Sequence, residues 1–186
     1  MLLWRLIYLI KRRREYRLGF AGERAVAEEL NQLMLDGCRV FHDVPMEPYG
    51  NIDHVLIAPA GIYAVETKAR RKRKTSAGKR DYEVVFDGKM LQFPGATDSQ
   101  SLRQARQQAD RLRVFLSDAV GESVKVGAIL TFSGWFVTNR TKDNLEVLNP
   151  KGIRAAIIDR RSPVLSKQLI DRILYQLDRK CRDVEL

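Results

Sequence analysis

The pattern of apolar and polar residues predicts a chain of alternating helices and strands. Residues 19–36 have apolar side chains at helical spacing and stop at a glycine, whereas residues 38–44 form a short β-prone run. Two further β-prone runs, 51–58 and 61–68, flank a Pro-Ala-Gly break, which is typical of a β-hairpin. Both sides of this hairpin are mostly apolar, so we expect a central pair of strands covered on both faces.

Beyond this hairpin the pattern predicts a smaller hairpin, two helices and further strands. An Asp-Gly turn joins the strands of the smaller hairpin, and Asp98 or Ser99 can cap the next helix, which stops at Gly121. A Ser-Pro pair opens the last helix. The expected elements are a hairpin over 82–86 and 90–93, a loop over 94–97, a helix to 120, a buried strand over 124–132, short strands near 146–148 and 155–158, and a helix with its apolar face over 165–181.

The central hairpin brings two acidic residues and a lysine together. With its loop at 59–60 or 58–61, paired residue numbers sum to 119, so Asp53 lies across from Glu66. Side chains alternate along a strand, which puts Asp53, Glu66 and Lys68 on one face. Two opposed carboxylates repel each other, and a divalent cation between them would reverse that interaction. We therefore expect a metal site with Asp53 and Glu66 as ligands and the Thr67 backbone carbonyl as a further oxygen.

Such a site can hydrolyse a nucleic-acid backbone without a histidine, serine or cysteine. Mg²⁺ is often held by one or two carboxylates together with water and substrate phosphate. The ion lowers the pKa of a bound water and stabilises charge on a phosphodiester under attack. Lys68, on the same strand, would orient that water or neutralise the developing charge.

Three residues on predicted helices are open to two interpretations each. Glu23 lies on or beside the apolar stripe of the first helix, either as a first-turn residue favoured by the helix dipole or as a carboxylate aimed at the Asp53 site. Gln104 and Gln108 flank the apolar stripe of the later helix one turn apart. They are either solvent-facing helix formers or a source of an amide that positions a water or a phosphate.

The charge of the chain favours a polyanionic partner. Lys and Arg number 33 against 23 Asp and Glu, which gives a net charge of +10. Nucleic acid and an anionic membrane surface both fit, as does a basic protein with neither partner. The densest basic run, 69–81, begins just after Lys68 and is either a solvated loop, a phosphate-contacting surface or a nuclear-targeting signal. The nucleic-acid contacts that we expect in this run are Arg70, Arg71, Lys72, Arg73, Lys74, Lys79 and Arg80.

Residues 1–18 form an apolar segment followed by a basic one. The apolar run is too short to span a bilayer and contains Arg5. The basic residues follow the apolar run, whereas in a signal peptide they precede it. An interfacial helix that contacts a membrane surface through residues 1–14 is one interpretation. A helix docked on the domain or on a second copy in a homodimer is the other. We expect residues 19–186 to form one domain of a cytoplasmic protein, with peripheral membrane contact through this segment left open.

The cysteines and histidines offer few ligands for other kinds of metal site. Cys38 and Cys181 are far apart and form no CxxC or Cys/His cluster, so we expect reduced thiols rather than a disulfide or structural zinc. Only His42 and His54 are available for a histidine-based site.

Four short motifs occur in order: Gly19-Phe-Ala-Gly-Glu23, Asn51-Ile-Asp-His-Val-Leu-Ile57, Gly61-Ile-Tyr-Ala-Val-Glu-Thr-Lys68 and Leu102-Arg-Gln-Ala-Arg106. Together they resemble the NERD (nuclease-related) domain, a family of the PD-(D/E)xK restriction-endonuclease-like nucleases, and the similarity covers about residues 19–132. The resemblance implies an α/β fold with a restriction-endonuclease-like core. In that core a central mixed β-sheet is flanked by helices in the order α-β-β-β-α-β, and here an extra C-terminal helix follows.

The resemblance also implies the roles of the site residues. Asp53, Glu66 and Lys68 form the catalytic core, Glu23 is the helix-borne acid and Gln104 the helix glutamine. The chain departs from the family by Ile52 in place of the proline of the superfamily's name, and by the long basic insertion after the core lysine.

The leading hypothesis is a nuclease that depends on Mg²⁺ or Mn²⁺, with DNA favoured over RNA and endonucleolytic cleavage favoured. The alternatives are a non-catalytic nucleic-acid-binding module with a vestigial site, and a membrane-associated signalling or scaffold domain.

Overall fold

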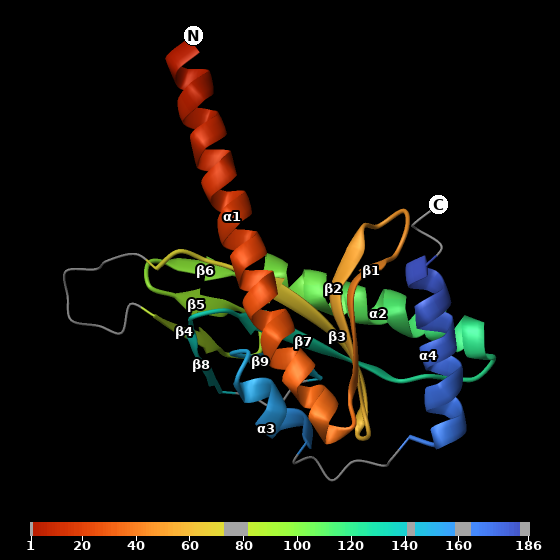
Figure 1. Cartoon of the computed structure of the whole chain (residues 1–186). Helices are drawn as coiled ribbons and strands as arrows, with labels where there is room; N and C mark the ends of the chain where they lie inside the picture. Colours follow the sequence, from red (N-terminus) through yellow and green to blue (C-terminus); the bar gives the residue numbers. More distant parts are fainter. Residues whose placement is uncertain (1, 73–81, 141–143, 159–164, 183–186) are drawn as a thin grey trace.

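The computed structural model describes residues 2–72, 82–140, 144–158 and 165–182 of the chain. Helices and strands alternate along it as shown in Figure 1. The elements are α1 (Leu2–Gln32), the 3-10 helix η1 (Leu33–Asp36), β1 (Arg39–Pro45), β2 (Asn51–Ala58), β3 (Gly61–Lys68), β4 (Glu83–Phe86), β5 (Leu91–Phe93), β6 (Ala96–Asp98), α2 (Gln100–Val120), β7 (Val126–Phe132), β8 (Phe136–Asn139), β9 (Leu145–Leu148), α3 (Gly152–Ile158) and α4 (Lys167–Arg182).

A mixed sheet forms the centre of the domain. Within the described residues its strand order is β1-β2-β3-β7-β9, in which β1, β2 and β3 pair antiparallel. The pairs β3 with β7 and β7 with β9 are parallel. Helices flank this sheet on both sides (Figure 1). The α/β class and the central mixed sheet flanked by helices are therefore confirmed, and the arrangement is consistent with a restriction-endonuclease-like fold.

Apolar side chains on the two faces of the sheet join two separate clusters. Val55, Ile57 and Ala64 pack with residues of α2 and α4. Leu56 and Val65, which alternate with them, pack with residues of α1 and α3. The prediction that the central hairpin is covered on both faces is confirmed, and it explains why both strands read as nearly continuous apolar runs.

The register of the central hairpin is the predicted one. Its pairs run from His54 with Val65 to Ala58 with Gly61, and their numbers sum to 119. Extending the same register by one pair places Asp53 opposite Glu66.

A second sheet lies beside the first and was only partly expected. Its order in the described residues is β6-β5-β4-β8. The antiparallel β4–β5 hairpin was predicted, but the loop expected over 94–97 is wrong because β6 begins at Ala96, and β8 was not expected. Both missed strands are only three or four residues long and depend on pairing with neighbours.

The first helix is much longer than predicted. It begins at Leu2 rather than at residue 19 and runs without a break to Gln32. The stretch before Gly19 contains Leu, Arg and Lys, which favour helix, and no proline interrupts it. Gly37 ends η1 in the left-handed conformation with φ of 84°, so the predicted stop is confirmed.

The C-terminal part contains one wrong assignment and one correct one. The strand expected near 155–158 is instead the end of α3, whose buried residues Ile153 and Ile157 are spaced four apart. That spacing and the intervening alanines favour a helix over a strand. The predicted last helix is present as α4, with Ile173 and Leu177 buried on its apolar face.

Candidate active site

Three polar residues lie where β2 begins and β3 ends. Asp53 is on β2, and Glu66 and Lys68 are on β3. Asp53 lies two residues before Val55, and Glu66 lies two residues after Ala64, so they share the face of the sheet on which Val55 and Ala64 pack toward α2. The apolar face of the central hairpin therefore ends in a polar cluster, as the sequence predicted.

Glu66 is a buried carboxylate with only one of its oxygens in contact with a partner. The residue is 1% exposed. Its Oε1 lies 2.5 Å from the Lys68 ammonium nitrogen, and Lys68 itself is 31% exposed. Its Oε2 is buried and accepts no hydrogen bond from any described residue. A buried anionic oxygen without a donor is costly, so this atom is suited to a cation.

Asp53 lies beside Glu66 and has a strongly altered acidity. Its Oδ2 accepts a 2.7 Å hydrogen bond from the Thr67 backbone N–H. Burial raises the pKa of Asp53 to about 7, and repulsion from Glu66 adds to the increase. The Thr67 hydrogen bond and the Lys68 charge oppose this increase without cancelling it. Without a cation, the Asp53 carboxyl therefore keeps its proton to a higher pH than an exposed aspartate does.

Helix α2 contributes an amide to the same cluster. Gln104 Oε1 accepts a hydrogen bond from Lys68 Nζ at 3.0 Å, so the lysine is held between an amide and a carboxylate. Asp98 positions the start of this helix by accepting hydrogen bonds from both the backbone N–H and the hydroxyl of Ser101. The interpretation of Gln104 as a solvent-facing residue is therefore wrong.

Gln108, one turn further along α2, is also buried rather than solvent-facing. It is 6% exposed, and its Nε2 lies 3.5 Å from the Asn51 carbonyl oxygen at the start of β2. This contact ties α2 to the strand that carries Asp53. Gln108 therefore supports the backbone beside the site.

Helix α1 approaches the same end of β3 through a glycine. A Cβ on Gly22 would lie 2.8 Å from the Cβ of Ala69, the residue after Lys68, so no larger residue fits without a shift. Glu23 follows this contact and is exposed. Its charge is one of the smaller causes of the raised Asp53 pKa. The close approach of Gly22 was not predicted, although the glycine stands within the first motif.

The basic run after Lys68 leaves the site along an aromatic cluster. The Arg70 guanidinium lies 4.1 Å from the centre of the Phe93 ring, and its carbonyl accepts a 3.0 Å hydrogen bond from Trp135 Nε1. Arg71 and Lys72 are exposed. Arg73, Lys74, Lys79 and Arg80, which were also predicted to contact nucleic acid, lie outside the described residues.

The donor set at this site suits a hard divalent cation held mainly by oxygen. Among the described residues, no group of three or more His, Cys, Asp and Glu side chains gathers as a metal cluster. Asp53 and Glu66 nevertheless offer two carboxylates, one with a buried oxygen that lacks a donor. Mg²⁺ is commonly held by one or two carboxylates, with water and substrate phosphate completing its shell. The residues present therefore fit such an ion, and the contribution of the Thr67 carbonyl stays a prediction.

The two histidines contact each other rather than a residue of this set. His42 and His54 contact each other through their Nδ1 atoms at 2.8 Å, and Asn31 Oδ1 lies 3.0 Å from His42 Nε2. Cys38 and Cys181 are both free thiols, as predicted.

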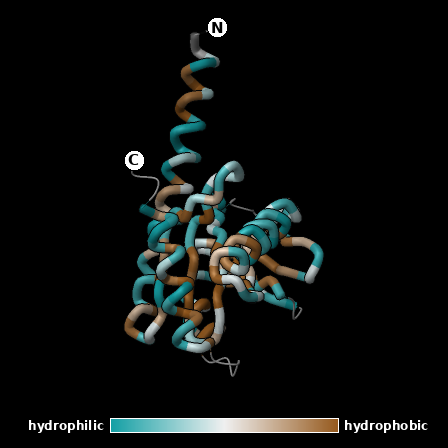
Figure 2. Tube along the Cα trace, turned by 90° about the vertical axis from the view of Figure 1, so that its right-hand side faces the viewer, coloured by the Kyte–Doolittle hydropathy of each residue, from teal (hydrophilic) through white to brown (hydrophobic). Residues whose placement is uncertain are grey.

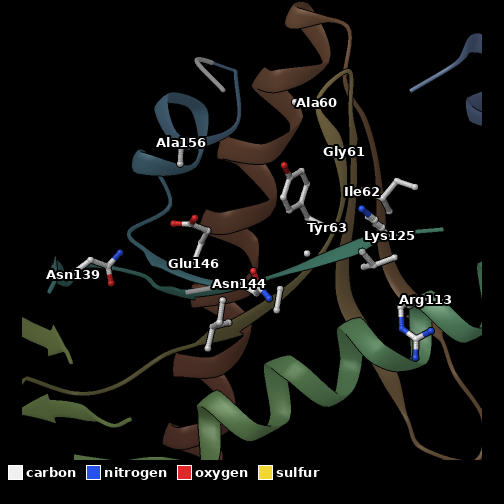
Figure 3. Close-up of a pocket in the computed structure, with 14 residues that line it drawn as sticks. Ala60, Gly61, Ile62, Tyr63, Arg113, Lys125, Asn139, Asn144, Glu146 and Ala156 are labelled. Atoms are coloured by element: carbon white, nitrogen blue, oxygen red, sulfur yellow. The ribbon is translucent and has the colours of Figure 1, made fainter. Parts of the chain in front are cut away.

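A pocket of about 940 Å³ lies toward the other end of β3 (Figure 3). Tyr63 and Glu146 lie on one side of it, and Arg113 and Lys125 lie on the other. Among the described residues, none of the predicted site residues lines this pocket. The predicted residues Asp53, Glu66, Lys68 and Gln104 instead lie together in the polar cluster at the end of β3.

Comparison with known proteins identifies a family for the part of the chain that carries these residues. A family model described as NERD, nuclease-related domain, matches residues 18–133, a span that includes every element carrying the cluster. No curated protein and no solved structure gives a significant match to the chain. Since the family model covers more than half of the chain, the chain belongs to the nuclease-related domain (NERD) family.

Proposed function

We propose that the chain is a nuclease that uses Mg²⁺ or Mn²⁺ to hydrolyse the backbone of nucleic acid, with DNA as the favoured substrate. The observation that carries the proposal is the buried Oε2 of Glu66, which lacks a donor and belongs to a carboxylate adjacent to Asp53. A structural ion pair would satisfy both oxygens of such a group. A half-satisfied carboxylate beside a second one instead favours a cation.

Asp53 and Glu66 would hold the cation. When bound, the ion lowers the pKa of a coordinated water and stabilises negative charge on the phosphate. Lys68 acts from the opposite side of Glu66, and its ammonium group donates to Gln104 and contacts Glu66 Oε1. An ammonium fixed at two points and still 31% exposed can stabilise charge on a phosphate oxygen as the attack proceeds.

Gln104 and Glu23 act around this core. Gln104 accepts from Lys68 and so fixes the direction of its ammonium group. Glu23 is exposed on α1, one residue after the Gly22 contact, and its charge is one of the causes of the raised pKa of Asp53. We therefore assign Gln104 as a positioning residue and Glu23 as an auxiliary acid.

The surface next to the site supports a polyanionic substrate. Arg71 and Lys72 are exposed just after β3, and the chain as a whole carries a net charge of +10. Contacts of this kind bind phosphates without reading sequence, and they weaken steeply as salt rises. We therefore expect little base-specific preference.

The proposal is tested by incubating the full chain with supercoiled plasmid, branched DNA and RNA in Mg²⁺, Mn²⁺ or EDTA. We expect metal-dependent cleavage of DNA that is lost in EDTA and in Asp53→Ala. Asp118→Ala, which removes an exposed carboxylate on α2, is the matched control and should cleave normally. The absence of cleavage of every substrate in both metals would refute the proposal.

One observation favours a second candidate, a nucleic-acid-binding module with a vestigial site. The described residues offer two carboxylates rather than a cluster of three or more metal-binding side chains. Such a module would bind DNA with a steep dependence on salt, and Asp53→Ala would leave both the affinity and that dependence unchanged. Binding without cleavage in this pattern would establish the second candidate in place of the first.

A further inference from the structure

The first half of α1 stands clear of the rest of the domain. The helix projects well beyond the sheets and the other helices (Figure 1). All residues from 4 to 17 are exposed, whereas Gly22 and Val26 further along are buried. At about 1.5 Å per residue, these exposed residues form a rod about 20 Å long. Nothing in the nuclease site requires this projection.

Apart from Arg5, the outer part of this rod is apolar on every side. Six large apolar residues there are exposed, and consecutive residues of an α-helix point about 100° apart. Residues 6–10 therefore face all directions, and the hydropathy view shows alternating apolar and polar bands on the projecting helix (Figure 2). The exposed fractions are Trp4 80%, Leu6 54%, Ile7 40%, Tyr8 60%, Leu9 53% and Ile10 44%. An apolar surface of this kind in water indicates an interaction site.

A basic collar follows the apolar tip directly. It consists of Lys11, Arg12, Arg13, Arg14 and Arg17, all exposed, with Glu15 as the acidic residue among them. Cationic side chains next to an apolar segment match the headgroup layer of an anionic membrane. Each contributes about 1 kcal/mol of attraction near such a surface.

We propose that the N-terminal half of α1 inserts its apolar tip into an anionic membrane surface, with the basic collar at the headgroups. A helix lying flat in the interface needs one polar face, which residues 6–10 lack. Tip-first insertion instead places all sides of residues 6–10 in the apolar layer, with Arg5 as the one charged residue between Trp4 and Ile10. Within the described residues, no helix has the length and hydropathy to cross a bilayer. Residues 4–10 are about 10 Å long at about 1.5 Å per residue, which fits within one leaflet, whose hydrocarbon layer is about 15 Å deep.

A second copy of the chain is a poorer occupant of this surface. Side-by-side helices bury an apolar stripe and leave the other sides polar, whereas here apolar residues surround the helix. Parallel association would also bring two basic collars together. Their positive charges would repel each other, because Glu15 is the one acidic residue within each collar. An anionic membrane offers an apolar layer to the tip and negatively charged headgroups to the basic collar.

The proposal connects the membrane to the candidate active site through one continuous helix. Glu23 lies on α1 about 20 Å along the axis from the end of the apolar tip at Ile10, at about 1.5 Å per residue. The helix would hold the site at a defined height above the bilayer. The membrane contact does not rest on the proposed nuclease activity, and either one can fail without the other.

The test is co-sedimentation of the full chain with vesicles of phosphatidylcholine alone or mixed with an equal amount of phosphatidylglycerol. We expect binding to the anionic vesicles and at least tenfold weaker binding of Leu6→Asp/Leu9→Asp, because acidic residues oppose insertion. The charge variant Arg12→Gln/Arg13→Gln/Arg14→Gln should bind about a hundredfold more weakly, at about 1 kcal/mol per charge. Its matched control, Lys89→Gln/Lys125→Gln/Lys151→Gln, removes three exposed charges elsewhere and should bind as the wild type does.

Tryptophan fluorescence reports the insertion itself. The chain has two tryptophans, and Trp135 is already buried at 4% exposure, so a blue shift on vesicle binding must come from Trp4. Trp4→Phe should still sediment with anionic vesicles but lose the shift. Equal sedimentation of the wild type and Leu6→Asp/Leu9→Asp would overturn the proposal. The proposal would also be overturned if the chain did not bind vesicles and instead formed a lipid-free dimer that Leu6→Asp/Leu9→Asp dissociates. That result would assign the apolar tip to contact with a second copy.

Discussion

Asp53 should destabilise the metal-free protein above neutral pH. Burial raises its pKa from 3.8 to about 7, with repulsion from Glu66 as the next cause. The folded state therefore binds the proton more tightly than the unfolded state. The stability that the protonated carboxyl contributes is fully present below its pKa in the unfolded state. It is lost as the pH rises through its pKa in the folded state. Between pH 4 and pH 7 the metal-free protein should lose stability through this one group.

The size of the loss follows from the difference between the two pKa values. At about 1.4 kcal/mol per unit, a change of about three units corresponds to about 4 kcal/mol at pH 8. Because Asp53 is partly exposed, water reduces this value, and we expect about 2–4 kcal/mol. Asp53→Asn removes the charge and keeps an oxygen that can accept the Thr67 N–H. The variant should unfold about 5–15 °C higher than the wild type in EDTA at pH 8.

The assay is thermal unfolding of both proteins in EDTA and in Mg²⁺, at pH 5 and pH 8. The stability gained by Asp53→Asn should be much smaller at pH 5, where the wild-type carboxyl is mostly protonated in the folded state. Mg²⁺ at ten times its dissociation constant should stabilise the wild type by about 1.4 kcal/mol and the variant by less. Asp118→Asn, an exposed carboxylate on α2, should show neither effect.

Two results would refute this reasoning about Asp53. One is an Asp53→Asn variant that is less stable than the wild type at pH 8 in EDTA, since the carboxylate would then be favourable in the fold. The other is equal stabilisation of both proteins by Mg²⁺, since the ion would then bind elsewhere.

Two further substitutions test the helices around the site. Gln104→Ala should slow cleavage about 10–100-fold because Lys68 loses the amide acceptor at 3.0 Å, whereas Gln107→Ala, exposed on the same helix, should leave the rate unchanged in a plasmid-nicking assay. Equal rates in the two variants would remove Gln104 from the site. Gly22→Ala should destabilise the protein by about 1–3 kcal/mol in urea unfolding, because its Cβ would lie 2.8 Å from that of Ala69. Adding Ala69→Gly should restore most of this loss, and a double variant as unstable as Gly22→Ala would contradict the close approach.

The central hairpin could be predicted because its information is local. A short break at Pro59 and Ala60 fixes the register, and the register alone places Asp53 opposite Glu66. The apolar runs on both strands likewise require helices on both faces. The covered central pair of strands and the relative position of the acidic pair therefore followed from residues fewer than twenty positions apart, whereas the fold class came from the resemblance of four motifs spread over residues 19–132.

The contacts that were missed join residues far apart in the chain. Trp135 binds the carbonyl of Arg70, 65 residues earlier, and β8 pairs with β4 across a similar distance. Neither pattern is visible in a local stretch of sequence. The strand expected near 155–158 failed for another reason, because a run of Ala and Ile suits either a short strand or one turn of helix until its partner is known. Ile153 and Ile157 pack against the cluster that contains α1, and this packing favours the helix.

The acidic pair of Asp53 and buried Glu66 is the central claim, and Glu66 tests it most directly. The measurement is the rate of plasmid nicking in saturating Mn²⁺ by the wild type, by Glu66→Gln and by Glu47→Gln, an exposed carboxylate on the β1–β2 loop. Glu66→Gln keeps the size of the side chain but removes the charge on the oxygen that lacks a donor. We predict a loss of at least about a hundredfold for Glu66→Gln and wild-type nicking for Glu47→Gln. Equal nicking by all three proteins, or none by the wild type, would contradict the claim.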